Sequence, residues 1–291
     1  MRSSSVRQTV RSIALPVAFS GIGLAVVFVL KKLLHVDLSK LELSIIAFIT
    51  TSLSILLLFP KVFKIPFGKV SIGDFVKNVG LSIPRKTYKY VLLGIMAALF
   101  TLSGMLIGSI LTGKFAFSLA TITLAQAVFS LTPGIWEEVL FRGVMMIVLL
   151  RLTKSFKKAC IIQIVIFGLA HIKGADLLSL VDSFSVTVLA VAFTYIAYKT
   201  RSLIPGIIFH WLHDTFLFFV QLPDGEYSGF RDNALFYGGL WIATALAAVC
   251  IKMLSEKCSI VNDYDFYSLK WIGVSFVPVR VSGRGVGAPR K

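Results

Sequence analysis

Residues 118–150 read SLATITLAQAVFSLTPGIWEEVLFRGVMMIVLL. The run is apolar and longer than the roughly 20 residues that a membrane-spanning helix needs. Its second half nevertheless holds two glutamates and an arginine. Such groups are costly at membrane depth, at about 2.5–3.5 kcal/mol each on insertion scales for Arg, Lys or Asp. The stretch therefore indicates a membrane helix whose ionisable side chains have a functional or structural role.

The composition of the whole chain agrees with a membrane protein. Of its 291 residues, 56% are hydrophobic and 15% are charged, and the mean hydropathy is +0.85. Soluble domains carry about 25% charged residues and about 45–50% apolar ones, and disordered chains have low hydrophobicity. Both classes are excluded. The three cysteines have no Cys-x-x-Cys spacing, so neither a disulfide framework nor a thiolate zinc site is indicated.

Apolar runs recur along the chain at lengths typical of membrane helices. They predict an all-α, polytopic membrane protein with about eight transmembrane helices. The runs lie near residues 13–30, 43–60, 90–112, 118–150, 159–171, 179–198, 203–220 and 234–254.

The basic residues predict the orientation of these spans. With an inside N-terminus and eight spans, the inner segments hold 23 Lys and Arg residues and the outer segments hold 6. Basic residues accumulate in cytoplasmic loops, so we expect both termini in the cytoplasm, and the plasma membrane as the location if the source is prokaryotic. The same rule explains the net charge of +16 without nucleic acid as a partner.

The predicted spans and loops divide the chain into four parts. We expect N-terminal membrane helices with a basic cytoplasmic loop at 1–112, a catalytic helix core at 113–220, a last membrane helix at 221–254 and a cytoplasmic tail at 255–291.

Ionisable groups inside the apolar runs gather in three stretches. The first is Trp136-Glu137-Glu138-Val139-Leu140-Phe141-Arg142-Gly143, the second is Phe167-Gly168-Leu169-Ala170-His171, and the third is His210-Trp211-Leu212-His213-Asp214. Each alone is compatible with a structural role, as an ion pair, an interfacial histidine or a buried hydrogen-bonded pair. Their coincidence in neighbouring spans favours a common site.

Helical spacing separates the two adjacent glutamates. Glu138 and Arg142 are four residues apart and can pair on one face, which predicts a structural support. Glu137 points about 100° away and lacks this partner. A carboxyl group without a cation in a partly dry site suits a general base that works near neutrality.

The same spacing rule applies to the third stretch. His210 and Asp214 are four residues apart and can project into one cavity. His213 lies three residues from His210, so it either shares that cavity or forms its wall.

A carboxylate with imidazoles in a membrane cavity fits water activation for peptide hydrolysis. The chain has no His-Glu-x-x-His zinc helix. It also lacks a Gly-x-Ser-Gly motif and a Tyr-Asp with Gly-x-Gly-Asp pair. A glutamate-based hydrolase or a metal site built from Glu137, His171 and His210 remains.

In this order and spacing, Glu137-Glu138-x-x-x-Arg142, Phe167-x-x-x-His171 and His210-x-x-x-Asp214 resemble the three motifs of the CAAX prenyl protease and bacteriocin-processing family of intramembrane proteases. That family includes the Rce1-type CAAX endopeptidases. The resemblance covers roughly 118–220 and implies an all-helical bundle with a conical intramembrane cavity open toward the cytoplasm.

By the resemblance, Glu137 and His171 activate the attacking water. His210 and the residue at 214 stabilise the oxyanion, and Glu138 and Arg142 support the site. No cofactor is implied. The expected substrate is a prenylated or otherwise membrane-bound peptide, with CAAX-type removal of the C-terminal tripeptide after a prenylated cysteine as the leading candidate.

One residue departs from the best-understood Rce1-type members, which have Asn where this chain has Asp214. An ionised Asp only accepts hydrogen bonds, so it cannot itself donate to an oxyanion. Two alternatives to a glutamate peptidase stay open. One is a zinc metalloprotease that uses the same residues, and the other is a transporter or a non-catalytic or bacteriocin-immunity membrane protein.

Overall fold

The computed structural model describes residues 14, 18, 22–33, 35, 37–61, 71–113, 116–117, 122–221 and 230–262. Within these ranges the regular secondary structure is helical apart from one short antiparallel ladder, in which β1 (Ala116–Phe117) pairs with β2 (Val220–Gln221). The all-α prediction is confirmed. Residues 62–70 of the predicted basic loop and 263–291 of the predicted tail lie outside the described residues.

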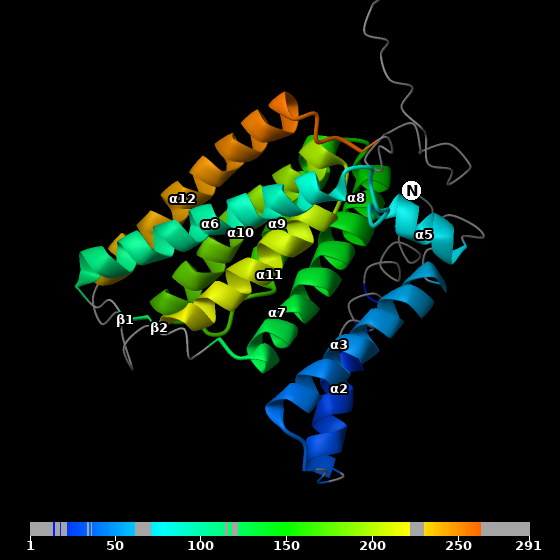
Figure 1. Cartoon of the computed structure of the whole chain (residues 1–291), viewed down its shortest axis with the longest axis horizontal. Coiled ribbons are helices and arrows are strands. Elements are labelled where there is room, and N and C mark those ends of the chain that lie inside the picture. The colour runs from blue at the N-terminus through cyan, green and yellow to red at the C-terminus, as the bar shows by residue number, and fades with distance from the viewer. Residues whose placement is uncertain are drawn as a thin grey trace, which may run out of the picture.

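Within the described residues, each predicted apolar run overlaps a helical segment. The helices in chain order are α2 (Ile22–Phe28) with the π-type turn η1 (Val29–Leu33), α3 (Lys40–Leu57), α5 (Ile72–Asn78), α6 (Thr87–Thr112), α7 (Leu124–Glu137), the π-helical segment η3 (Glu138–Met145), α8 (Met146–Thr153), α9 (Phe156–Leu169), α10 (Leu177–Thr200), α11 (Ile204–Phe219) and α12 (Phe230–Lys257) (Figure 1).

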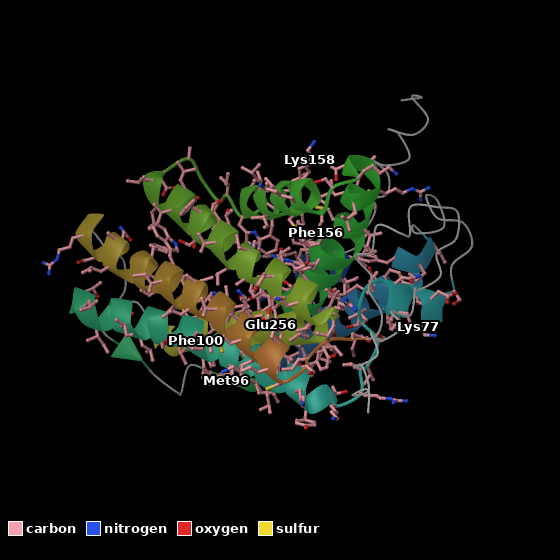
Figure 2. The ribbon with its side chains drawn as sticks, turned by 90° about the horizontal axis from the view of Figure 1, so that it is seen from above. Lys77, Met96, Phe100, Phe156, Lys158 and Glu256 are labelled. Carbon is pink, nitrogen blue, oxygen red and sulfur yellow. The ribbon has the colours of Figure 1, made fainter. Side chains whose placement is uncertain are left out.

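Four helical stretches among the described residues are long and apolar enough to cross a membrane: Lys40–Lys61, Thr87–Thr112, Leu177–Thr200 and Arg231–Lys257. Their outer faces carry large exposed apolar side chains, such as Met96 on α6 and Ile242 on α12, which are 40% and 67% exposed (Figure 2). An apolar surface of this kind suits contact with lipid.

Helix α9 has 14 residues and α11 has 16. At 1.5 Å per residue they are roughly 21 and 24 Å long, less than the ~30 Å hydrocarbon core of a bilayer. Helix α11 carries His210 and His213, and His171 lies two residues past the end of α9.

Local sequence signals explain where several helices begin. Ser39, Ser71 and Thr123 each form a capping box, in which the N-cap hydroxyl accepts from the N3 amide and the N3 side chain accepts from the N-cap amide. Thr123 thereby fixes the start of α7, the helix that leads into Glu137.

The helices pack as a bundle with α6 against both α11 and α12, and with α7 between α3 and α11 (Figure 1). Helix α10 packs against α9, α11 and α12. The arrangement places η3, α9, α10 and α11 around one buried centre.

Candidate active site

The predicted pair of Glu138 and Arg142 is present and fully buried. Arg142 donates from one terminal nitrogen to Glu138 Oε1 at 2.9 Å, and both side chains have no exposed area. The guanidinium lies over two aromatic rings, 4.2 Å from the centroid of Phe167 and 5.2 Å from that of Phe193. Its other terminal nitrogen donates to the carbonyl of Ala190 at 3.4 Å. The pair therefore links η3 to α9 and α10.

His210 is held from two sides. Its Nδ1 lies 3.0 Å from Glu138 Oε1, and because a carboxylate only accepts, Nδ1 carries the proton and donates. The imidazole stacks on Phe193, with ring centroids 4.7 Å apart and planes at 15°. Nε2 is thereby directed away from Glu138. It lies 3.7 Å from Glu137 Oε2 and 3.6 Å from Asp214 Oδ2.

His171 is oriented by the helix that precedes it. Its Nδ1 donates to the carbonyl oxygen of Phe167 at 2.8 Å, so the proton of a neutral ring sits on Nδ1. Its Nε2 lies 3.8 Å from Glu137 Oε2. In the neutral ring this nitrogen has a free lone pair on the side of Glu137.

Glu137 is the point where these groups converge. It is the last residue of α7, is 8% exposed, and has an Oε2 atom without a hydrogen-bond partner among the described residues. The Nε2 atoms of His171 and His210 lie within 3.8 Å of that oxygen. The structure therefore brings Glu137, His171, His210 and Asp214 together from three helical segments, as the sequence predicted.

These groups line a cavity of about 390 Å³. Its deep wall contains Glu137 and His210, which are buried, whereas Lys173 and Leu217 at its edge have exposed side chains, 76% and 50% respectively. A cavity of this size falls in the range of ligand pockets in proteins.

His213 forms part of the cavity wall. Its Nδ1 lies 3.2 Å from the hydroxyl oxygen of Thr101 on α6, and its ring meets Phe209 edge-on. The contact with Thr101 ties α11 to α6. Of the two positions that the sequence left open, the wall is the one observed.

Two features of the site escaped sequence reasoning. Phe193 stacks on His210 and lies under Arg142, yet it is one of 24 phenylalanines and stands in an apolar context. Lys173 at the cavity edge pairs with Asp182 of α10 at 3.0 Å. The sequence signal for Lys173 was its closeness to His171, which it follows by two residues. No spacing rule pointed to its partner Asp182.

Close helix packing places the ionisable groups that line the cavity, and glycines allow this packing. A Cβ at Gly134 would lie 3.2 Å from the amide nitrogen of Trp211, so this glycine lets α7 approach α11. Gly168 lets α9 approach α10, because a Cβ there would overlap the hydroxyl of Thr187. The carbonyl of Gly168 also accepts from the hydroxyl of Ser183 at 2.7 Å.

Gly168→Ala should therefore force α9 away from α10 and displace His171, which follows three residues later. Overpacking of this kind costs about 1–3 kcal/mol. We expect a lower unfolding temperature in detergent together with a lower rate of the reaction that the site performs. Gly238→Ala on α12 is the matched control, because nothing lies within 4 Å of a Cβ at that glycine. Equal behaviour of the two variants would contradict the positioning role of Gly168.

Among the residues that the structure describes, no group of three or more His, Cys, Asp or Glu side chains is placed as a metal site requires.

Comparison with known proteins agrees with the motif spacing. No curated protein and no solved structure matches the chain. A match to a protein family does exist, and it covers about a third of the chain. Residues 119–216, which supply Glu137, His171, His210 and Asp214, match the family described as type II CAAX prenyl endopeptidase Rce1-like, and the resemblance seen in the sequence is thereby confirmed.

Proposed function

We propose that the protein is a glutamate-type membrane endopeptidase that cleaves membrane-associated peptides. The observation that carries the proposal is the convergence of His171 Nε2 and His210 Nε2 on the buried carboxylate of Glu137 at 3.8 and 3.7 Å. The family match of residues 119–216 supports a hydrolase. Carboxylate and imidazole groups at these separations suit the activation of a water that bridges them.

The proposed reaction has two proton transfers. Water held between Glu137 and His171 Nε2 attacks the scissile carbonyl carbon while Glu137 accepts its proton, which forms a tetrahedral oxyanion. His210 donates from Nε2 to that oxyanion. The C–N bond then breaks as protonated Glu137 returns the proton to the leaving amine. Glu138 and Arg142 act indirectly, since Glu138 holds the Nδ1 proton of His210.

Asp214 has a positioning role in this scheme. Its Oδ2 lies 3.6 Å from His210 Nε2, so a carboxylate there favours a protonated Nε2 that can donate to the oxyanion. The oxyanion thus receives its hydrogen bond from His210, and Asp214 acts through that ring.

Asp214→Asn should keep kcat within about tenfold of the native value, or about 1.4 kcal/mol in activation free energy. The amide has the size of the carboxyl group and can itself donate to the oxyanion. Asp214→Leu, which offers no polar group, should lower kcat by about 10²–10³-fold. If Asn and Leu reduced kcat equally, the amide would not replace the carboxylate, and the expectation that an Asn at position 214 can serve the oxyanion would be wrong.

The membrane arrangement proposed here has eight spans around a conical cavity. The support is that each apolar run overlaps a helical segment of the described residues and that the cavity extends from exposed edge residues to the buried Glu137. Both termini lie in the cytoplasm in this proposal, because 23 basic residues fall in the inner segments and 6 in the outer ones.

The leading candidate reaction is removal of a C-terminal tripeptide after a prenylated cysteine. A second cavity of about 420 Å³ supports it, because its walls are mainly apolar and it shares Phe129 and Phe218 with the first cavity. An apolar cavity that adjoins the one containing the proposed base suits a hydrocarbon chain attached to the peptide.

The decisive test is a cleavage assay on a farnesylated CAAX peptide with the purified protein in detergent, run beside an unprenylated membrane peptide. Mass spectrometry of the products identifies the bond that is cut. Cleavage of the farnesylated peptide after its cysteine supports CAAX specificity, and cleavage of only the second peptide restricts the function to membrane peptides in general. If the protein cuts neither peptide, the proposed peptidase activity is contradicted.

The same assay separates the two alternatives. A zinc metalloprotease loses activity on exhaustive chelation and regains it with zinc, whereas the glutamate mechanism keeps it. A transporter or a non-catalytic immunity protein cuts neither peptide.

A further inference from the structure

The catalytic cavity lies at one end of the helix bundle. It is lined by the first half of the continuous helix formed by α7, η3 and α8, by residues at and just after the end of α9, by the first two thirds of α10 and by the second half of α11. We call this the cavity end: the end at which α7 and α10 begin and α9 and α11 end. Its exposed edge residues, Lys173 and Leu217, belong to the same end.

The connections at the other end are held together by hydrogen bonds. The amide of Leu203 donates to the carbonyl of Gly80 at 2.9 Å, and the amide of Asn262 donates to the carbonyl of Thr200 at 2.9 Å. Lys89 Nζ donates to the carbonyl of Cys258 at 2.9 Å. The segments that follow α5, α10 and α12 therefore meet at one end, which we call the basic end.

The end of α3 also lies at the basic end. Phe59, just past α3, meets Phe75 of α5 edge-on, with ring centroids 6.4 Å apart. The start of α9 lies at this end too, because Phe156 contacts Tyr198 near the end of α10, with ring centroids 4.6 Å apart (Figure 2). Lys154 precedes this helix start, and Lys157 and Lys158 are in its first turn. Among the residues that the structure describes, the segments at the basic end thus hold 13 Lys and Arg residues, and those at the cavity end hold 5.

Basic residues in short loops are retained in the cytoplasm during membrane insertion. Because the cavity lies at one end of the bundle and the basic segments lie at the other, we infer that the catalytic cavity opens on the non-cytoplasmic face of the membrane. The resemblance to CAAX proteases implied a cytoplasmic opening, and the basic-residue count implied cytoplasmic termini. In this fold the two expectations exclude each other, because the cavity and the basic loops lie at opposite ends.

This inference rests on the proposed function and narrows its substrate. The natural substrate is a peptide segment presented at the outer leaflet or exported across the membrane. Chemical preference and side of access are separate properties. Cleavage of a prenylated peptide in detergent reports the fit of the pockets, whereas the side of access determines which pool of peptides the enzyme meets.

Cysteine labelling tests the side without any need for activity. In a background with Cys160, Cys250 and Cys258 changed to alanine, Leu177→Cys marks the cavity end and Ile83→Cys marks the basic end. Both positions are well exposed, at 70% and 82%, and neither lines a cavity. Leu124→Cys, at the start of α7 and 67% exposed, replaces Leu177→Cys if that variant fails to fold.

A membrane-impermeant maleimide should label Leu177→Cys in intact bacterial spheroplasts and Ile83→Cys only in inverted vesicles. The reverse pattern, or equal labelling of both positions from one side, overturns the inference. A peptide that the purified enzyme cleaves, made membrane-impermeant, should then be cut by right-side-out vesicles and spared by inverted ones. If the purified protein cuts no peptide, the proposed function fails while the labelling result still stands.

Discussion

Glu137→Gln should lower kcat by about 10²–10⁴-fold, the range that a general base contributes. The amide cannot accept the proton of the attacking water, although it has nearly the same shape as the carboxyl group. Folding should be unaffected, because Glu137 Oε2 has no hydrogen-bond partner among the described residues. The measurement is kcat for the peptide cleaved in detergent, together with the thermal unfolding profile of the same preparation.

Glu256→Gln is the matched control for this variant. Glu256 is more than half exposed and pairs with Lys199 at 2.6 Å, at the far end of the bundle from the cavity. It should keep the native kcat. Normal turnover of Glu137→Gln would show that another group deprotonates the water.

Arg142→Ala should reduce the free energy of unfolding by about 3–5 kcal/mol, as expected when one partner of a buried ion pair is removed. Glu138 and Arg142 are both without exposed area, so the remaining carboxylate has no access to water. The change also removes the cation that lies over Phe167 and Phe193. Lower yield of folded protein and a lower unfolding temperature in detergent are the measurements.

A double variant separates loss of charge pairing from loss of packing. Glu138→Gln with Arg142→Met removes both charges and keeps most of the side-chain volume. It should recover a large part of the stability that Arg142→Ala loses, since no charge is left buried alone. It should remain poor in turnover, because His210 loses the carboxylate that holds its Nδ1 proton. Native stability of Arg142→Ala would contradict the supporting role of the pair.

Much of the site followed from residue spacing. The four-residue interval predicted that Glu138 pairs with Arg142 and that His210 and Asp214 face one space, and both contacts are observed. The apolar runs located the helices because length and hydropathy decide helix formation in a membrane. Such rules work within one helix, where geometry fixes which side chains are neighbours.

Contacts between helices could not be predicted in this way. His213 meets Thr101, and His210 meets Glu138 and Phe193, across separations that no spacing rule covers. The end of the bundle at which the cavity opens also required the fold. The basic residues indicated the orientation of each span, but only the packed helices show where the polar side chains meet.

The π-helical segment Glu138–Met145 has a consequence for chain length. Segments of this kind accommodate one extra residue within an otherwise continuous α-helix. Deleting a single residue there would close the wide turn into ordinary α-helix and leave the helices on either side in nearly the same orientation. A deletion within α7, which has no such extra residue, would instead turn the residues before the deletion by about 100° relative to Glu137. The chain should accordingly tolerate the loss of one residue between Glu138 and Met145 better than the loss of one residue within α7.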